Sequence, residues 1–97
     1  MADLSVIGDF VVSLQGRDKG RVYLVVKTEG DYLYLCDGNF KRLSSPKKKK
    51  QKHTKPLSAG SPSIGEKLKS GRQVFDSEIY SALKAYQVQN SNKKAED

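Results

Sequence analysis

Three cations lie on or directly beside a short loop that has a glycine at each end. The loop is Gly16-Arg17-Asp18-Lys19-Gly20, and Arg21 follows it. Glycine takes a positive φ without a Cβ clash, so the chain can turn sharply at both ends of this loop. Cations on a fixed turn lose little freedom on binding, which suits contact with the phosphates of a polyanion. The alternative is an ordinary charged turn, and in both cases we expect Asp18 to hold the shape of the loop.

A second and denser group of cations follows later in the chain. Lys41, Arg42 and the run at 47–55 together hold eight of the eighteen basic residues. Such a run can neutralise backbone phosphates and release counterions, which gives affinity and salt dependence but little sequence discrimination. The stretch KKKKQK also fits a basic nuclear localisation signal, and a solvated loop is the third interpretation. The residue types leave all three open.

Few side chains could support catalysis or bind a metal. Cys36 and His53 are the only thiol and the only imidazole, and a nucleophilic pair would also need a group that orients the base and donors for the oxyanion. A structural zinc site needs four ligands. The 16–20 loop fits neither the Walker spacing nor the dinucleotide-binding fingerprint. We therefore expect a protein that is not an enzyme and binds no metal or cofactor.

Length and charge limit the class of protein further. Ninety-seven residues predict one domain with a small core. The net charge of +7 indicates a polyanionic partner or a heavily solvated surface, and a single cysteine excludes an intrachain disulfide framework. The first ten residues lack the features of a cleaved signal peptide, and no stretch approaches the ~20 apolar residues of a membrane span. We expect a cytoplasmic protein with no membrane association.

Short strands must position the glycine-bounded loop. Runs of branched and aromatic side chains predict strands at 11–14 and 22–26, one on either side of the loop. A third strand is expected at 32–36, where the alternation assigns Leu33 and Leu35 to the core.

A fourth strand is expected to complete a hairpin with the third. Asp37-Gly38 predicts a tight turn, because a primed turn needs positive φ at its central positions, and residues 40–43 form the returning strand. Four strands at this spacing predict a small barrel or a curled antiparallel sheet. Tyr32 and Tyr34 share one strand face and Phe40 lies across the hairpin. These rings could stack unpaired bases or cover the core, and both interpretations stay open.

The composition changes after the predicted sheet. Segment 44–56 is rich in lysine, and because like charges repel, we expect it to be an extended or mobile basic loop. Residues 58–74 are rich in Gly and Ser and predict a flexible connector. Residues 91–97 are expected to be a disordered tail.

One helix is expected, over residues 75–90. Asp76 or Ser77 can act as its N-cap by accepting free backbone N–H groups of the first turn. Apolar residues at helical spacing form a narrow stripe, which consists of Ile79, Leu83 and Tyr86. The stripe could dock on the sheet or bind a partner, and the sequence leaves this open.

The residues around the loop also resemble a known motif. Val11-Val12-Ser13-Leu14, the stretch from Gly16 to Arg21, and Val25-Val26 are similar to the KOW motif of ribosomal proteins and transcription elongation factors. The match covers residues 6–57 and is nearest to the fourteen-e class of large-subunit ribosomal proteins. Gly20 falls at the central glycine of the motif, whereas Tyr23 stands where many KOW sequences have another glycine. The resemblance implies an SH3-like barrel over residues 1–57, RNA binding, and a fifth short strand at 53–57.

The expected function is RNA binding by a mainly β protein, a small SH3-like KOW barrel followed by a basic loop and one C-terminal helix. It would be ribosomal or ribosome-associated in the cytoplasm and would contact RNA phosphates through residues 16–21 and 41–55. The expected RNA-binding residues are Gly16, Arg17, Lys19, Gly20, Arg21, Lys41, Arg42, Lys47, Lys48, Lys49, Lys50, Lys52 and Lys55. The alternative is a KOW protein-interaction module that binds a ribosomal or transcription-machinery protein through its C-terminal helix. DNA binding is a weaker third alternative, because phosphate attraction alone does not separate the two nucleic acids.

Overall fold

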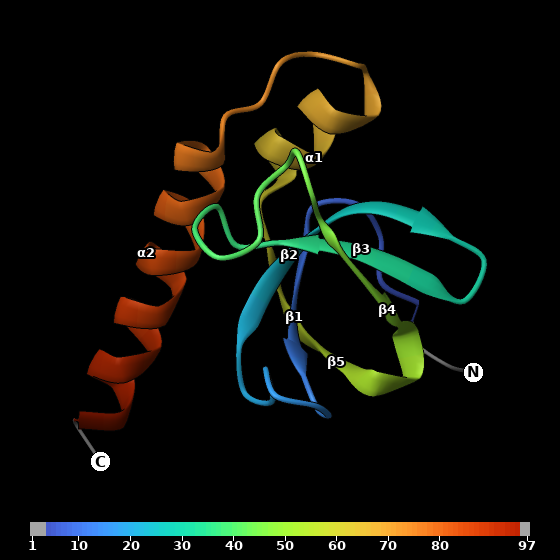
Figure 1. Cartoon of the computed structure of the whole chain (residues 1–97). Helices are drawn as coiled ribbons and strands as arrows, with labels where there is room; N and C mark the ends of the chain where they lie inside the picture. The colour runs from blue at the N-terminus through green and yellow to red at the C-terminus, as the bar shows by residue number, and fades with distance from the viewer. Residues whose placement is uncertain (1–3, 96–97) are drawn as a thin grey trace.

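The computed structural model describes residues 4–95, with side chains described as far as Asn90. Its strands are β1 (Asp9–Ser13), β2 (Val22–Glu29), β3 (Tyr32–Cys36), β4 (Lys47–Lys50) and β5 (Thr54–Gly60). Its helices are the 3-10 turn η1 (Gln51–His53), α1 (Pro62–Lys69) and α2 (Asp76–Ala95). The expected mainly β fold with a C-terminal helix is confirmed, because the chain forms one antiparallel sheet followed by α2 (Figure 1).

The five strands form one strongly curved sheet. Their order is β4-β3-β2-β1-β5, and all neighbouring pairs are antiparallel. The two edge strands are consecutive in the chain and are joined only by the three residues of η1. The sheet must therefore curl until its edges approach each other. Register shifts between Val25 and Lys27 and between Asp9 and Val11 support this curvature, since a bulge bends its strand.

Alternate residues of the sheet belong to two separate apolar clusters. The first cluster consists of Val11, Tyr23, Val25, Leu33 and Leu35. The second consists of Phe10, Leu24, Cys36, Ile64, Ile79 and Leu83. The strand residues of the two clusters alternate because successive side chains point to opposite faces of a strand. The assignment of Leu33 and Leu35 to the core is confirmed, and both faces of the sheet are buried over part of their area.

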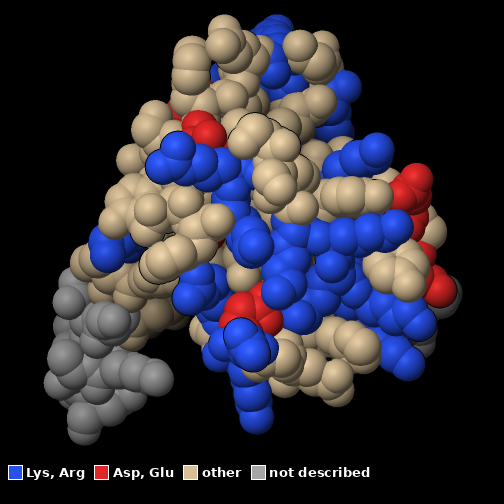
Figure 2. Space-filling model, in the orientation of Figure 1, with Lys and Arg blue, Asp and Glu red and all other residues tan. Residues whose placement is uncertain are grey.

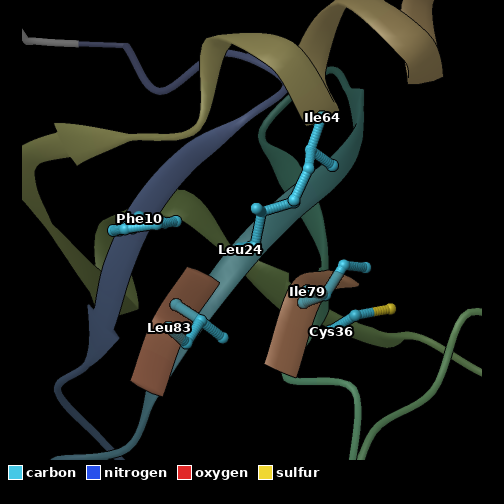
Figure 3. Packing of buried hydrophobic residues seen from close by; sticks show 6 residues of the cluster. All are labelled: Phe10, Leu24, Cys36, Ile64, Ile79 and Leu83. Atoms are coloured by element: carbon cyan, nitrogen blue, oxygen red, sulfur yellow. The ribbon is translucent and has the colours of Figure 1, made fainter. Parts of the chain in front are cut away.

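Helix α2 docks on one face of the sheet through its apolar stripe. Ile79 is fully buried and Leu83 nearly so, and both belong to the apolar cluster that contains Phe10, Leu24 and Cys36; Figure 3 shows Ile79 beside Cys36. Tyr86 packs edge-on against Phe10, with the ring centroids 5.3 Å apart. Burying one such side chain contributes roughly 1.5–3 kcal/mol. The stripe left open in the sequence therefore belongs to the core.

The expected strand at 40–43 is wrong. Residues 37–46 form a loop in which Asp37 accepts the backbone N–H groups of Asn39 and Lys41. The N–H of Leu43 donates to the side chain of Asp76 at 2.7 Å, so this segment is bound to α2 rather than to a strand. The partner position beside β3 is instead occupied by β4.

The basic segment is more ordered than its charge suggested. Lys47–Lys50 forms strand β4, where an extended or mobile loop was expected. Lys47 and Lys49 lie close to the carboxylate of Asp18, whereas the ammonium of Lys48 lies 4.6 Å from the ring centre of Tyr32. An acidic side chain and aromatic rings thus offset the repulsion between neighbouring lysines.

The expected connector at 58–74 contains regular structure. Strand β5 continues to Gly60, in agreement with the expected fifth strand, and α1 follows it. Ser61 caps α1 by accepting the N–H of Ile64 at 3.4 Å, and Pro62 occupies the first turn, where its missing N–H costs nothing. The Ser-Pro pair was the sequence signal for this helix. Ile64 of α1 belongs to the apolar cluster with Phe10 and Leu24, and this contact stabilises the helix.

Helix α2 differs from the prediction at both ends. It begins at Asp76, whose carboxylate binds the 37–46 loop, so neither Asp76 nor Ser77 is the expected N-cap. Glu78 accepts the N–H of Phe75 at 3.0 Å and satisfies a donor at this end. Of the tail expected at 91–97, residues 91–95 continue the helix and the last two lie outside the described residues.

Candidate nucleic-acid interface

Asp18 anchors the glycine-bounded loop to the sheet. Its carboxylate accepts hydrogen bonds from the hydroxyls of Ser13 and Tyr23, each at 2.8 Å. The ammonium groups of Lys47 and Lys49 each lie 3.2 Å from a carboxylate oxygen. Both ends of the loop have positive φ, 91° at Gly16 and 90° at Gly20, as expected. The loop is therefore fixed by side chains from β1, β2 and β4 that bind Asp18, which holds the shape of the loop as expected.

The ionisation of Asp18 fits this role. Burial alone would raise the pKa of its carboxyl, but hydrogen bonds from Ser13, Tyr23 and the two lysines outweigh burial and hold the pKa well below its usual range. Burial, and next the hydrogen bond to Asp18, raise the pKa of Tyr23, whose hydroxyl stays protonated as a donor. The anchor is thus a charged acceptor surrounded by donors.

Contact with Asp18 divides the predicted RNA-binding cations near the loop into two groups, those that bind its carboxylate and those that remain free. Arg17 and Lys19 flank Asp18 in the loop and are exposed, so they are available to a ligand. Lys49 has a side chain only 10% exposed and also donates to the carbonyl of Gln15. Lys47 is 30% exposed and remains partly accessible. Lys49 therefore has a structural position, although the sequence grouped it with the free lysines.

The outer face of β3 and β4 combines tyrosines with lysines. Lys48 lies over the rings of both Tyr32 and Tyr34, and Lys50 lies 6.0 Å from the ring centre of Tyr32. The hydroxyl of Tyr34 donates to Glu29 at 2.7 Å, a hydrogen bond that raises the pKa of the phenol and lowers that of the carboxyl. The lysine side chains cover the tyrosine rings, and their charged ends are exposed.

The remaining basic segments meet beside the loop. The N–H of Leu14 donates to the carbonyl of His53 at 2.9 Å, and Ser13 pairs with Thr54 across β1 and β5. These contacts bring the exposed side chains of Lys52 and Lys55 to the base of the loop. Figure 2 shows Lys and Arg side chains gathered over β3 and β4, with few Asp or Glu side chains among them. We call the exposed cations of this region the basic surface; they are Arg17, Lys19, Lys48, Lys50, Lys52 and Lys55.

Three further predicted residues belong to the 37–46 loop or contact it. The guanidinium of Arg21 lies 4.2 Å from the ring centre of Phe40 and 3.9 Å from the carboxylate of Asp37. Arg42 is exposed and donates to the carbonyl of Asn39. Lys41, the third, is half-buried. These residues therefore lie on a second surface, one shaped by the contact of this loop with α2.

This second surface contains a pocket that the sequence analysis did not identify. It has a volume of about 300 Å³ and lies between the 37–46 loop and α2. Phe40 and Tyr80 both line it and are both exposed. Phenylalanine within a polar loop was the available signal, but its partner Tyr80 is forty residues away and comes near it only through the docking of α2.

The residues considered for catalysis or metal binding have ordinary structural positions. Cys36 is fully buried, and burial, with Asp76 and Asp37 adding to it, raises the pKa of its thiol to about 12. Among the described residues, no group of three or more His, Cys, Asp or Glu side chains could hold a metal ion. Neither helix of the described chain has the length and apolar character needed to span a membrane.

Comparison of the sequence with models of known protein families and with curated proteins finds no match. Any functional assignment therefore depends on the geometry of the basic surface.

Proposed function

We propose that this chain is an RNA-binding protein of the KOW class that acts on or near the ribosome. The observation that carries the proposal is the anchoring of the glycine-bounded loop by Asp18, with the exposed residues Arg17 and Lys19 on either side of it. A loop whose backbone is fixed before binding loses less conformational freedom when its side chains contact phosphates. The loop thus carries its cations on an anchored backbone, whereas a flexible cationic tail would have to become ordered on binding.

The arrangement of the strands supports an SH3-like barrel. Five short antiparallel strands curl around one apolar cluster, and a single 3-10 turn joins the two edge strands. The loop that resembles the KOW motif connects β1 and β2 at one end of this sheet. RNA helices are recognised mainly by shape and backbone, and a rigid cationic loop beside exposed lysines fits that mode.

The protein-interaction alternative is weaker in this structure. It assigned partner binding to the apolar stripe of α2, but Ile79 and Leu83 are buried against the sheet. A partner would need another surface of the helix. RNA binding requires no such rearrangement, because the basic surface is already exposed.

The test is a charge-neutralising pair of substitutions in the loop. The Arg17→Gln/Lys19→Gln variant should bind a structured RNA more weakly, and the slope of log K against log salt should become shallower by about 2, because two phosphate contacts are lost. Fluorescence anisotropy at several salt concentrations measures both quantities.

The matched control removes one arginine and one lysine elsewhere. Lys69→Gln/Arg72→Gln changes exposed residues of α1 and the turn after it, and lowers the net charge equally. The control should retain most of the salt slope. Equal losses in the two variants would mean that only net charge matters and would overturn the claim of a positioned loop.

A further inference from the structure

The pocket beside α2 differs chemically from the basic surface. Its lining combines exposed aromatic rings, Phe40 and Tyr80, with the cations Arg21 and Lys84. Phe40 is 69% exposed although it lies in a firmly held loop. Arg21 lies over its ring, and Lys84 lies 5.8 Å from the ring centre of Tyr80. Flat apolar faces thus lie beside positive charge.

Contacts between the 37–46 loop and α2 form the pocket in the unbound protein. Asp37 holds a local turn by accepting two backbone N–H groups, and Asp76 binds the N–H of Leu43. Gly38 packs so closely on the helix that a Cβ there would overlap the backbone of Asp76 and Tyr80. The aromatic rings are therefore presented by a preformed wall, so little ordering would accompany binding.

The one acidic side chain in the lining is already neutralised. Asp37 lies 3.9 Å from the guanidinium of Arg21, and its side chain is only 12% exposed. Two backbone N–H groups donate to its other oxygen. An anionic ligand therefore meets the positive charge of Lys84 and the exposed part of Arg21, beside a carboxylate that is mostly buried and already has partners.

We propose that this pocket binds one unpaired nucleobase of an RNA strand, which stacks on Phe40 while its neighbouring phosphates lie against Arg21 and Lys84. The proposal rests on the RNA binding proposed above and adds a site for a base to a surface that otherwise contacts the backbone. A volume of about 300 Å³ lies at the lower end of the range of small-ligand sites. It has room for a single base.

The experiment compares two RNA duplexes that differ only in one base. One duplex carries a single bulged nucleotide, and the other carries an abasic residue at the same place, so the phosphates are identical. Stacking on an aromatic side chain is worth roughly 1–3 kcal/mol, about 5- to 150-fold in affinity. We expect the full chain to prefer the bulged duplex by a factor in this range, measured by fluorescence anisotropy.

Two phenylalanine variants then locate the effect. Phe40→Ala should abolish the preference for the bulged duplex and leave the salt slope unchanged, because no cation is removed. Phe75→Ala is the matched control, since Phe75 is 55% exposed and lies outside the pocket lining. The control should retain the preference in full.

The experiment distinguishes failure of the base site from failure of the proposed RNA binding. If both duplexes bind equally well to the unchanged protein, or if Phe40→Ala weakens both alike, the pocket is not a base site, and backbone binding stands. If neither duplex binds at moderate salt, the proposed RNA binding fails and the base site fails with it.

Discussion

At the scale of single residues, Asp18 is the side chain on which the candidate interface depends. It is the one acidic residue of the glycine-bounded loop, and it connects that loop to two lysines about thirty residues later in the chain. Two buried hydroxyls complete its surroundings. The same group thus sets the position of Arg17 and Lys19 and fixes which lysines of β4 remain free.

We expect Asp18→Asn to destabilise the protein at neutral pH and to remove a part of its acid sensitivity. The carboxylate has a folded-state pKa below the ordinary value of 3.8, so the unfolded state binds more protons as the pH falls toward that value. Its contribution is therefore complete above about pH 5 and is lost progressively at lower pH. Hydrogen bonds to a charged group suggest a loss of about 2 kcal/mol at pH 7.

Urea unfolding at a series of pH values between neutral and about 3 measures this effect. The difference between Asp18→Asn and the unchanged protein should narrow as the pH falls. Asp31→Asn is the control, because Asp31 is an exposed residue of the β2–β3 turn. A difference that stayed constant over the whole range would show that the pKa of Asp18 is not lowered in the folded state.

At the scale of elements, β4 is the clearest case of alternating roles. Lys47 and Lys49 face Asp18, whereas Lys48 and Lys50 lie on the outer face over the tyrosines. The period of two along a strand separates these side chains. A run of four identical residues in the sequence therefore makes two different sets of contacts in the structure.

The two lysine pairs should respond differently to the same substitution. Lys48→Gln/Lys50→Gln should weaken RNA binding and make the salt slope shallower by up to about 2, with little change in the free energy of unfolding. Lys47→Gln/Lys49→Gln should lower the free energy of unfolding, because Asp18 loses its cationic partners. Urea unfolding and anisotropy on both variants make the comparison, and each pair is the charge-matched control for the other. Equal changes in RNA affinity and in the free energy of unfolding for the two variants would contradict the separate roles of the two lysine pairs.

At the scale of the whole molecule, two surfaces meet around one end of the sheet. The basic surface extends from the 16–20 loop to β4 and the start of β5, and the pocket lies where the 37–46 loop meets α2. Arg21 follows the loop in sequence and reaches Phe40 at the pocket, so it links the two. One RNA with a structured region and an unpaired base could contact both.

Sedimentation of cell extract on sucrose gradients tests the proposed place of the protein in the cell. We expect the chain to migrate with large ribosomal subunits at moderate salt and to be released at high salt, because phosphate contacts weaken as counterions are added. The loop variant Arg17→Gln/Lys19→Gln should be released at lower salt than the unchanged protein. A chain that stays at the top of the gradient at both salt concentrations would contradict ribosome association.

Local patterns predicted the elements whose neighbours are close in sequence. The branched runs around the loop, the alternation of Leu33 and Leu35, and the stripe on α2 all follow from preferences within a few residues. The strand at 40–43 was wrong because Asp37-Gly38 turns the chain toward α2, and a hairpin signal does not report a helix that arrives later. Helix α1 was not predicted because the Gly- and Ser-rich composition of residues 58–74 indicates a flexible connector, and the Ser-Pro pair is a single local signal against it.

The sequence by itself determined the cationic loop with positive φ at both glycines, the strands beside it, the helix and the excess of positive charge. Only the tertiary structure decided that the lysine run pairs with β3, that Asp18 binds two of its members, and that Phe40 and Tyr80 line one pocket. The physical reason is distance along the chain. Backbone preferences and side-chain alternation act over a few residues, whereas these contacts join residues at least twelve positions apart in the chain and form only when the sheet curls and α2 docks on it.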